Sequence, residues 1–274
     1  MLSYLHHFHA GNHADVLKHW LLLECVHYLQ KKPAPFEYID THSGAGMYRT
    51  NSAEAMKTGE ISNGILKLDP KAFPELEYLW EEVLPDIDKK QYPGSPKLVQ
   101  RLLRDGDKAW LYEMHPRVIK ELKENCEVRR QCYVKQEDGF KGLLSVLPAK
   151  TGRALVLIDP SYEVKKDYET VVDIVAKAHK KMAQATIAIW YPVVNRSTIS
   201  YMENSIRKSG IKNAHLFEIG VADDEDKGMT SSGMMIVNPP WTLAEKFEGV
   251  SERLSAALSE DGVSRARYLR LTAE

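Results

Sequence analysis

The sequence predicts an α/β fold, with a mostly parallel β-sheet covered by helices on both faces, an antiparallel hairpin and a small helical insertion. Three observations support this prediction. Short apolar segments alternate with amphipathic helical patterns, which is typical of a parallel sheet. A polar stretch interrupts the alternation after the first expected strand. Near the C-terminus, two strands follow each other with no helix between them.

The expected strands are short and apolar, and Thr186–Tyr191 is apolar throughout, as a strand buried on both faces should be. A helix should precede the first strand. Asn12 is its expected N-cap, Asp15 follows three residues later, and the helix should end near Lys31–Pro33. The other expected elements are strands Phe36–Asp40, Trp110–Glu113, Cys132–Lys135 and Ala154–Asp159, and helices Pro116–Glu124, Phe140–Leu147, Tyr168–Met182 and Thr198–Lys208.

Two segments depart from simple alternation. Residues 51–92 contain a polar stretch and then a helical pattern, Phe73–Leu84. We interpret 51–92 as an inserted helical subdomain, and 1–50 with 93–274 as a Rossmann-like domain. Ala214–Ile219 and Met234–Val237 are joined by an acidic loop without a helix, so they should pair antiparallel. A parallel sheet that ends in an antiparallel strand is the layout of the S-adenosylmethionine-dependent methyltransferase fold.

The composition indicates an ordinary globular protein. The chain has 274 residues, of which 43% are hydrophobic and 27% charged, enough for a sizeable core. No apolar run approaches the roughly 18 residues of a membrane span, and the N-terminus lacks the layout of a signal peptide. Cys25, Cys126 and Cys132 form no CxxC pair. We therefore expect reduced, buried thiols and a cytoplasmic protein that acts as a monomer.

The net charge of −1 argues against a protein that coats nucleic acid without specificity. A nucleic-acid substrate remains compatible with it, because a local basic face can supply phosphate contacts. In Arg117–Lys135, lysines and arginines outnumber glutamates. We expect Arg129 and Arg130 within this segment to bind the substrate; a solvated helix face followed by a turn is the alternative. Acidic stretches occur at Glu75–Asp88 and Asp223–Asp226.

Polar residues follow three of the expected parallel strands, at the edge where open α/β sheets bind ligands. Asp40 and His42 follow the first strand, beside a Gly-rich turn at Gly44 that allows a close approach of a ligand. Glu113 ends the second strand and can accept hydrogen bonds from ribose hydroxyls. Asp138, after the third, can accept one from an adenine amino group. Each site alone also fits a turn or a helix start, but together they predict a pocket for a nucleoside-containing cofactor.

The N-terminal segment is rich in histidine, which raises the hypothesis of a metal site. Neither a cysteine nor an HExxH pattern supports it, and Asn12 separates His9 from His13 at the expected helix start, so we predict no metal. Lys18 and His19 are better explained as a cation and a donor that reach a carboxylate at the ligand edge. A helix face that is merely polar is the alternative.

Two segments resemble the catalytic corner of enzymes that methylate the exocyclic amines of bases. One is Asp-Pro-Ser-Tyr at Asp159–Tyr162, after the fourth parallel strand. The other is Asn-Pro-Pro-Trp at Asn238–Trp241, which fits the pattern to the letter but follows a strand expected to run antiparallel. Its chain end should therefore lie at the opposite edge of the sheet. We predict that Asp159–Tyr162 is the catalytic corner and that Asn238–Trp241 is a rigid turn before the final helix.

The chemistry of this corner follows from the amine. The lone pair of an exocyclic amine is delocalised into the base, so the nitrogen is a poor nucleophile. Hydrogen bonds from its two N–H groups to the Asp159 carboxylate and the Pro160 carbonyl would localise the lone pair towards a methyl donor. Tyr162 would stack on the extruded base.

Together the motifs resemble the RlmJ family of bacterial 23S rRNA (adenine-N6) methyltransferases. The resemblance implies S-adenosylmethionine as cofactor and 23S rRNA, naked or in early assembly, as substrate, with no membrane or metal partner. Asp159 matches the family's catalytic Asp and Tyr4 its substrate-contacting Tyr; Asp40, Gly44 and Asp159 complete the expected cofactor site. The motifs are FHAGNHADVLKH, DTHSGAG, YPGSP, EMHP, EDGF, LIDPSY, WYPVV and GMTSSGMMIVNPPW. The implied cofactor contacts are Lys18, His19, His42, Ser95, Glu113, Asp138 and Gly139.

Ser161 departs from the family, which has Pro at this position. Proline would fix the local backbone, so serine adds unfolded-state freedom worth about 0.4–1 kcal/mol. Three alternative functions are also considered, and Ser161 bears on one of them. A DNA adenine-N6 methyltransferase would use the same corner, and a non-catalytic rRNA-binding assembly factor with a retained cofactor pocket is favoured by Ser161 alone. A nicotinamide oxidoreductase is disfavoured by the two-glycine turn and by the lack of a hydride-transfer partner.

Overall fold

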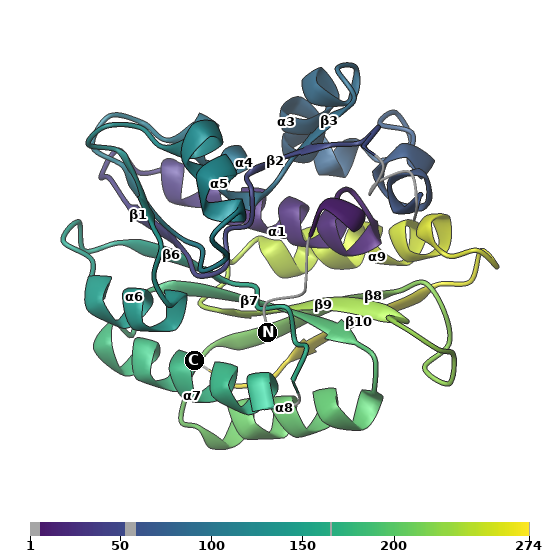
Figure 1. Cartoon of the computed structure of the whole chain (residues 1–274). Helices are drawn as coiled ribbons and strands as arrows, with labels where there is room; N and C mark the ends of the chain where they lie inside the picture. Colours follow the sequence, from purple (N-terminus) through teal and green to yellow (C-terminus); the bar gives the residue numbers. More distant parts are fainter. Residues whose placement is uncertain (1–5, 53–58, 165, 274) are drawn as a thin grey trace.

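The computed structural model describes residues 6–52, 59–164 and 166–273, and an eight-stranded sheet runs through it (Figure 1). The strand order is β10-β8-β9-β7-β6-β1-β4-β5. Strands β5, β4, β1, β6 and β7 are parallel, whereas β9, β8 and β10 pair antiparallel, so the predicted fold class is confirmed. The strands are β1 (Glu37–Asp40), β4 (Lys108–Tyr112), β5 (Cys132–Lys135), β6 (Ala154–Ile158), β7 (Thr186–Val193), β8 (Ala214–Gly220), β9 (Ser231–Val237) and β10 (Arg265–Arg270).

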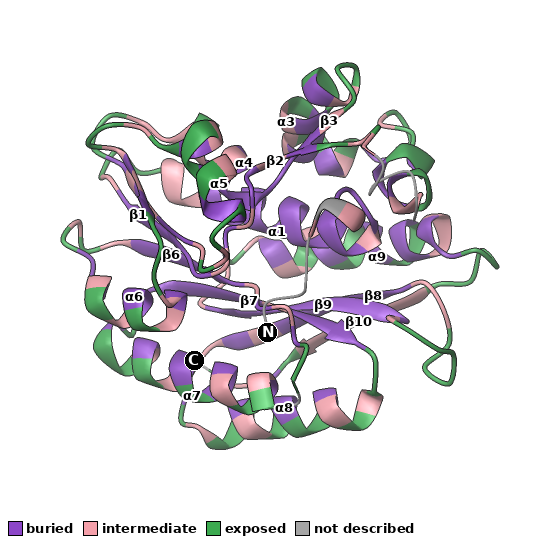
Figure 2. Ribbon diagram, in the orientation of Figure 1, coloured by how far each residue is buried: buried purple, intermediate pink, exposed green. Residues whose placement is uncertain are grey.

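Helices cover both faces of the sheet and enclose a hydrophobic core on each side (Figure 2). Every residue of β6 and β9 is buried, which explains why β6 and the second half of β9, Met234–Val237, are continuously apolar rather than alternating. On one face lie α1 (His13–Gln30), α4 (Ser95–Leu102), α5 (Val118–Cys126) and α9 (Leu243–Leu258). On the other lie α6 (Gly139–Val146), α7 (Lys166–Lys181) and α8 (Arg196–Lys208).

Helix α1 is buried on all sides. Asn12 caps it by accepting a hydrogen bond from the Asp15 backbone N–H, as predicted. Every residue from Ala14 to Val26 is buried, because α3, α4, α9 and the sheet surround the helix. Polar side chains within this stretch therefore require partners, since an unpaired buried charge is costly. Lys18 pairs with Asp159 at the ligand edge of the sheet, whereas Glu24 pairs with Lys246 of α9 at 2.8 Å.

The insertion begins and ends at a two-stranded ladder in which β2 (Met47–Arg49) pairs antiparallel with β3 (Gln91–Pro93). Between these strands, the described residues form short 3-10 turns and helix α3 (Glu77–Ile87). Leu79 and Val83 of α3 belong to the same core as α1. The helix expected at 73–84 is therefore present, and the division of the chain into two domains remains a proposal. The 3-10 turns are Glu60–Asn63, Ile65–Lys67 and Pro74–Leu76.

The C-terminal part contains the predicted β8–β9 hairpin and one strand that the sequence did not predict. Strand β10 pairs antiparallel with β8 at the edge of the sheet. Its sequence, RARYLR, has three arginines in six residues, and one of these charges is accommodated because Arg267 forms an ion pair with Glu203 of α8 at 2.6 Å. Edge strands bear such charges without burying them, which weakens their hydrophobic signal.

The Asn238–Trp241 turn lies where its strand direction requires. Val237 at the end of β9 pairs with Ile187 at the start of β7, so the turn follows at the amino edge of the parallel strands. Asp159 follows the opposite, carboxyl end of β6. The predicted separation of the two corners is confirmed.

Two further expectations concern the whole chain. Cys25, Cys126 and Cys132 are free and buried, as predicted. Among the described residues, no helix is long and apolar enough to cross a membrane.

Candidate active site

A cavity opens at the carboxyl ends of the parallel strands, and it is called the cofactor cavity below. It brings together residues that are far apart in the chain, because parallel strands present their loops at one edge. The sequence-predicted residues that line it are Lys18, His19, His42, Gly44, Ser95, Glu113, Asp159 and Pro160.

Glu113 ties two strand-end loops together. Its Oε2 accepts a hydrogen bond from the Gly44 backbone N–H at 3.1 Å, and its Oε1 accepts one from the His115 N–H at 2.7 Å. Gly44 has a φ of 62°, and a Cβ there would lie 2.2 Å from the Tyr48 hydroxyl. Glycine is therefore required at this position, and the backbone can approach a ligand closely. Each Glu113 oxygen keeps a lone pair that can accept a ribose hydroxyl.

Asp40 lies behind the cofactor cavity rather than in its wall. Its carboxylate is fully buried and accepts hydrogen bonds from the Tyr38 hydroxyl at 2.7 Å and the Ser95 hydroxyl at 2.8 Å. It also accepts one from the His42 backbone N–H at 3.3 Å. Burial raises the pKa of Asp40 to about 6, against these hydrogen bonds. Asp40 thus positions Ser95 and His42, which do line the cavity.

His42 is neutral in its buried position. Burial lowers its pKa to about 4, and its Nδ1 lies 2.8 Å from the Thr41 hydroxyl. Its ring packs edge-on against Phe140. The imidazole therefore offers a neutral hydrogen-bonding group to the cavity.

Asp138 and Gly139 start helix α6 beside this loop. The Asp138 carboxylate caps the helix by accepting hydrogen bonds from the backbone N–H groups of Phe140 and Lys141. A Cβ on Gly139 would lie 1.9 Å from the Thr41 carbonyl oxygen, so close packing requires glycine. Neither residue is part of the cavity lining, and an adenine contact for Asp138 remains a prediction.

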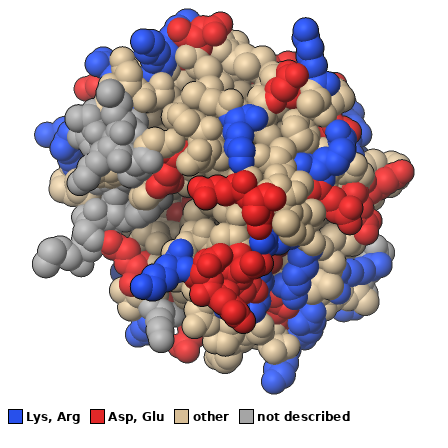
Figure 3. Space-filling view, turned by 90° about the vertical axis from the view of Figure 1, so that its right-hand side faces the viewer, with Lys and Arg blue, Asp and Glu red and all other residues tan. Residues whose placement is uncertain are grey.

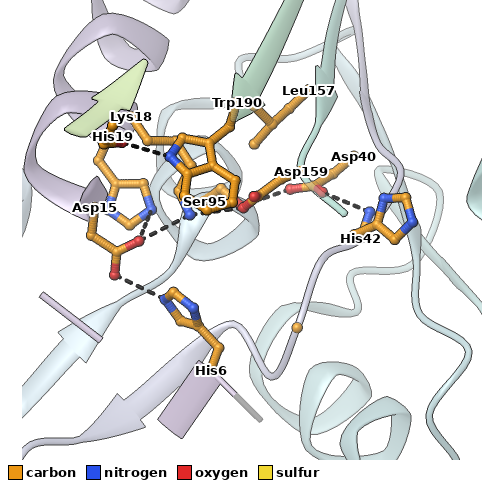
Figure 4. A network of polar contacts seen from close by, with 12 residues as sticks. His6, Asp15, Lys18, His19, Asp40, His42, Ser95, Leu157, Asp159 and Trp190 are labelled. Atoms are coloured by element: carbon orange, nitrogen blue, oxygen red, sulfur yellow. Dashed lines mark hydrogen bonds and ion pairs between the residues drawn. The ribbon is translucent and has the colours of Figure 1, made fainter. Parts of the chain in front are cut away.

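A buried network connects α1 to the predicted catalytic corner (Figure 4). Lys18 Nζ lies 2.7 Å from Asp159 Oδ2 and 2.9 Å from Asp15 Oδ1. Asp15 Oδ2 in turn lies 2.9 Å from His6 Nε2 and accepts a hydrogen bond from the Gly11 N–H. Lys18 therefore reaches a carboxylate at the ligand edge, as predicted.

The charges of this network constrain one another. Burial raises the pKa of Asp159, and the Lys18 ammonium opposes this rise. The two carboxylates beside Lys18 hold its pKa well above the usual range, although burial alone would lower it. The ammonium is consequently charged at neutral pH and keeps a positive charge against Asp159.

His19 has a different partner from the one expected. Its Nδ1 lies 2.9 Å from the Tyr92 hydroxyl, and the two rings stack at 5.6 Å. Its Nε2 lies 3.8 Å from Asp15 Oδ1, which is too far for a hydrogen bond. Burial lowers the pKa of His19 to about 3, so the ring is neutral. His19 was expected to donate a hydrogen bond to a strand-end carboxylate. In the structure its ring is hydrogen-bonded to Tyr92 of β3 instead.

A second cavity adjoins the first on the other side of Asp159, and it is called the base cavity below. Lys18, Asp159 and Trp190 line both cavities. The Lys18 ammonium lies 5.5 Å from the centre of the Trp190 ring, within the range of a cation–π interaction. Asp159 thus stands at the junction of two adjacent cavities, with its carboxylate fixed by Lys18.

Tyr162 forms part of the base cavity wall and is only 9% exposed. Its hydroxyl donates to the Trp190 carbonyl at 2.6 Å, and its ring packs against Tyr168 with centroids 4.4 Å apart. Its φ of 52° is unusual for a non-glycine residue. These contacts fix the ring, and stacking of Tyr162 on an extruded base remains a prediction.

Two of the predicted substrate residues, Arg129 and Arg130, are not brought to this edge. Arg129 and Arg130 are exposed in the turn before β5, and Cys132, at the start of β5, pairs with Ala109 near the start of β4. They therefore lie at the amino edge of the parallel strands, away from Asp159. The segment follows α5, which runs antiparallel to the strands and carries the chain away from the ligand edge. Tyr4 lies outside the described residues.

Two residues of the site were missed from the sequence. Asp15 was assigned to the helix start alone, although its spacing from Lys18 places both on one face of α1. Trp190 was read only as part of a buried strand, and its ring lines both cavities at the end of β7. An aromatic residue near a carboxyl strand end was the available signal. Among the described residues, no group of three or more His, Cys, Asp or Glu side chains is arranged to hold a metal ion.

Comparisons with known proteins agree with this geometry. A family model described as "Ribosomal RNA large subunit methyltransferase D, RlmJ" matches residues 33–269. The "Ribosomal RNA large subunit methyltransferase J" of Haemophilus influenzae is 41% identical over 269 residues, covering 96% of each chain. The protein of the same name from Escherichia coli is 39% identical over 272 residues, covering 97% of each.

A solved structure supports the same conclusion. The protein LPL1258 from Legionella pneumophila is 30% identical, with a TM-score of 0.85, and the match covers 96% of this chain and 98% of that one. With the family model spanning most of the sequence, the chain belongs to the RlmJ family of ribosomal RNA large subunit methyltransferases.

Proposed function

We propose that the chain transfers a methyl group from S-adenosylmethionine to N6 of an adenine in 23S rRNA. One observation carries this proposal beyond family membership: Asp159 lies at the junction of two cavities, and Lys18 holds its carboxylate in place. A methyl transferase needs such a junction, because donor and acceptor must meet while the rest of each molecule stays apart.

The cofactor cavity has the groups that S-adenosylmethionine requires. Glu113 offers carboxylate oxygens to ribose hydroxyls, and the glycine at Gly44 lets the backbone approach the ligand. Ser95 and His42 add neutral hydrogen-bonding groups. When bound, S-adenosylmethionine supplies an electrophilic methyl group on a positively charged sulfonium.

The base cavity would receive the target adenine, flipped out of its stack. One amine N–H would donate to the Asp159 carboxylate and the other to the Pro160 carbonyl. Both acceptors draw the N–H groups to one side of the nitrogen and localise its lone pair towards the cofactor cavity. Asp159 is then positioned to accept the proton that the methylated amine must lose.

Lys18 has a positioning role in this scheme. Its ammonium orients the Asp159 carboxylate through a 2.7 Å contact and opposes the pKa rise that burial causes. Without that charge, buried Asp159 would bind a proton more readily and lose its capacity to accept a hydrogen bond. Asp15 contacts Lys18 from the other side, and His6 in turn contacts Asp15.

Incubation with naked 23S rRNA, 16S rRNA and DNA tests the proposal. Digestion to nucleosides should give N6-methyladenosine from 23S rRNA only. Product from DNA alone would favour the DNA alternative, and binding without turnover would favour the assembly factor. We also propose that the protein is cytoplasmic, because naked or early-assembly rRNA is a cytoplasmic substrate in bacteria. We further propose that it acts as a monomer.

A further inference from the structure

The Asn238–Trp241 turn takes no part in the site described above, yet it leaves a large aromatic ring in solvent. Trp241 is 77% exposed, more than any other large hydrophobic side chain in the described part of the chain. Tryptophan is normally well buried, so an indole this exposed requires an explanation.

The turn itself is held firmly. The Asn238 side-chain amide donates to the carbonyl oxygens of Ala183 and Ala185 at 2.7 and 2.9 Å. Its backbone N–H donates to the Asn213 carbonyl at 2.9 Å. These bonds, followed by two prolines, give Trp241 a fixed base. They also use both N–H groups of the Asn238 side-chain amide, and its Oδ1, the atom that would accept from an amine, already accepts a hydrogen bond from the Asn213 side-chain amide at 3.5 Å.

The segments beside this turn are basic. Lys181 Nζ donates to the Leu147 carbonyl at 3.2 Å, so segments 147–153 and 180–185 adjoin one another. The hydrogen bonds of Asn238 join 180–185 and 208–213 to the turn. Across these segments and 238–242 there are six lysines and arginines and no Asp or Glu. The term basic ledge refers to Trp241 and four exposed lysines, Lys150, Lys180, Lys181 and Lys212.

Helix capping explains only part of this charge. Lys180 and Lys181 end α7, where cations favour the helix dipole. Lys150 and Lys212 lie outside any helix, and neither dipole nor core packing requires an exposed Trp241. Among the described residues, Glu37 contacts this region by accepting a hydrogen bond from the Thr151 backbone N–H, but Glu37 is buried and only 2% exposed.

The ligand edge of the sheet, unlike the basic ledge, is negatively charged near the base cavity. Acidic side chains gather in the middle of the face seen in Figure 3, around a hollow lined by the β8–β9 loop and the segment after α9. Met229 lines both this hollow and the base cavity, so the acidic face borders the place where the adenine would enter. Phosphates would be repelled there and attracted to the basic ledge. The acidic residues that line the hollow are Glu60, Asp223, Asp226, Glu260 and Asp261.

We propose that the basic ledge binds a second segment of the RNA substrate, with an unpaired base stacked on Trp241 and phosphates beside the lysines. Proteins hold single-stranded RNA with exposed aromatic rings and a basic surface, and here an exposed ring follows a turn that is bonded to two basic segments. The ledge lies at the amino edge of the sheet, and Asp159 follows the carboxyl end of β6. The five residues of β6, at about 3.3 Å per residue, separate the two by roughly 17 Å. The segment is therefore distinct from the target nucleotide, and two linked contacts raise the affinity for a long RNA.

Binding of naked 23S rRNA transcript at several salt concentrations tests this inference, which rests on the proposed RNA substrate. Trp241→Ala should weaken binding on the order of 10-fold, the effect of losing one stacked base. The triple variant Lys150→Glu, Lys180→Glu, Lys212→Glu should reduce the slope of log affinity against log salt by about two units. Trp241→Phe should restore most of the affinity, because a stacking surface remains.

Matched controls are Leu66→Ala, another exposed apolar side chain, and the triple variant Lys71→Glu, Lys89→Glu, Lys90→Glu in the insertion. They should bind RNA as the unmodified protein does. Ledge variants should raise KM for 23S rRNA, leave kcat at saturating RNA unchanged, and keep the thermal shift caused by S-adenosylhomocysteine. If the ledge variants bind RNA as tightly as the control variants do, the proposal that the ledge binds RNA is wrong. An unmodified protein that binds 23S rRNA through the ledge but never methylates it would overturn the proposed function instead.

Discussion

At the scale of single residues, the account depends on the contact between Lys18 and Asp159. The sequence predicted both residues at the ligand edge, from a strand end and from a polar position on the first helix. It could not predict their 2.7 Å contact or the role of Asp15 behind them, because contacts between residues 141 positions apart arise from tertiary packing. Asp15 and Lys18 are buried and Asp159 is partly buried, and these charges are stable together only because each has partners.

Lys18→Met tests the positioning role. It removes the ammonium and leaves the Asp159 carboxylate buried without its cation, so the pKa of Asp159 should rise further. Turnover should fall about 10²-fold or more, as expected for a misplaced or protonated acceptor. The loss should be smaller at high pH, where Asp159 is ionised again. A pH–rate profile of the same shape as that of the unmodified protein would contradict the role.

Glu113→Ala tests the cofactor cavity. The substitution removes the expected ribose acceptor and the link between Gly44 and His115. The rise in melting temperature caused by S-adenosylhomocysteine should therefore shrink, since a ligand that binds only the folded state stabilises it. Glu137→Ala, at an exposed carboxylate near the neighbouring strand end, is the matched control. A shift caused by NADH in place of S-adenosylhomocysteine would favour the oxidoreductase.

At the scale of elements, the periodicity of apolar residues was sufficient to predict the parallel strands and the helices between them. Buried strands and amphipathic helices have strong local patterns. Strand β10 was missed because its charged edge residues have no such pattern, and its pairing with β8 becomes apparent only in three dimensions. The expected strand directions correctly predicted that Asn238–Trp241 and Asp159 lie at opposite edges of the sheet. The same reasoning, applied to the segment after α5, would have placed Arg129 and Arg130 at the amino edge as well.

Ser161→Pro tests how firmly the catalytic corner is held. Proline should stabilise the protein by about 0.4–1 kcal/mol through the unfolded state, provided that residue 161 adopts a compatible backbone. Activity should stay the same or rise modestly. Tyr162 follows directly with a φ of 52°, so a clash there would instead lower the melting temperature. Thermal unfolding and turnover, measured on the same preparation, distinguish the two outcomes.

At the scale of the whole molecule, three neutral histidines make stability depend on pH: His19 is buried, and His13 and His42 are partly buried. Burial lowers the pKa of His13 and His42 to about 4 and that of His19 to about 3. The unfolded chain binds more protons below pH 6.5, so these groups reduce the free energy of unfolding as pH falls from about 6.5 towards 4. Asp40, with its pKa raised to about 6, acts in the opposite direction: its contribution is lost as pH rises from about 4 to 6.

His42→Gln should therefore make unfolding less sensitive to pH. Burial lowers the pKa of His42 from its usual 6.5 to about 4, which corresponds to at most about 3 kcal/mol. Urea unfolding at pH 4.5 and 7 should show a smaller difference in the variant than in the unmodified protein. An equal difference would mean that His42 is not held neutral by burial.

The most direct test of the central claim is methyl transfer to naked 23S rRNA by the unmodified protein, Asp159→Ala and Asn238→Ala, each confirmed to be folded. Asp159→Ala should lower turnover about 10²–10⁴-fold, the range for one positioned proton acceptor, while still binding S-adenosylhomocysteine. Asn238→Ala should lower the melting temperature through its lost carbonyl contacts and keep the turnover of folded protein near normal. Full activity in Asp159→Ala, together with an inactive but folded Asn238→Ala, would contradict the assignment of the catalytic corner.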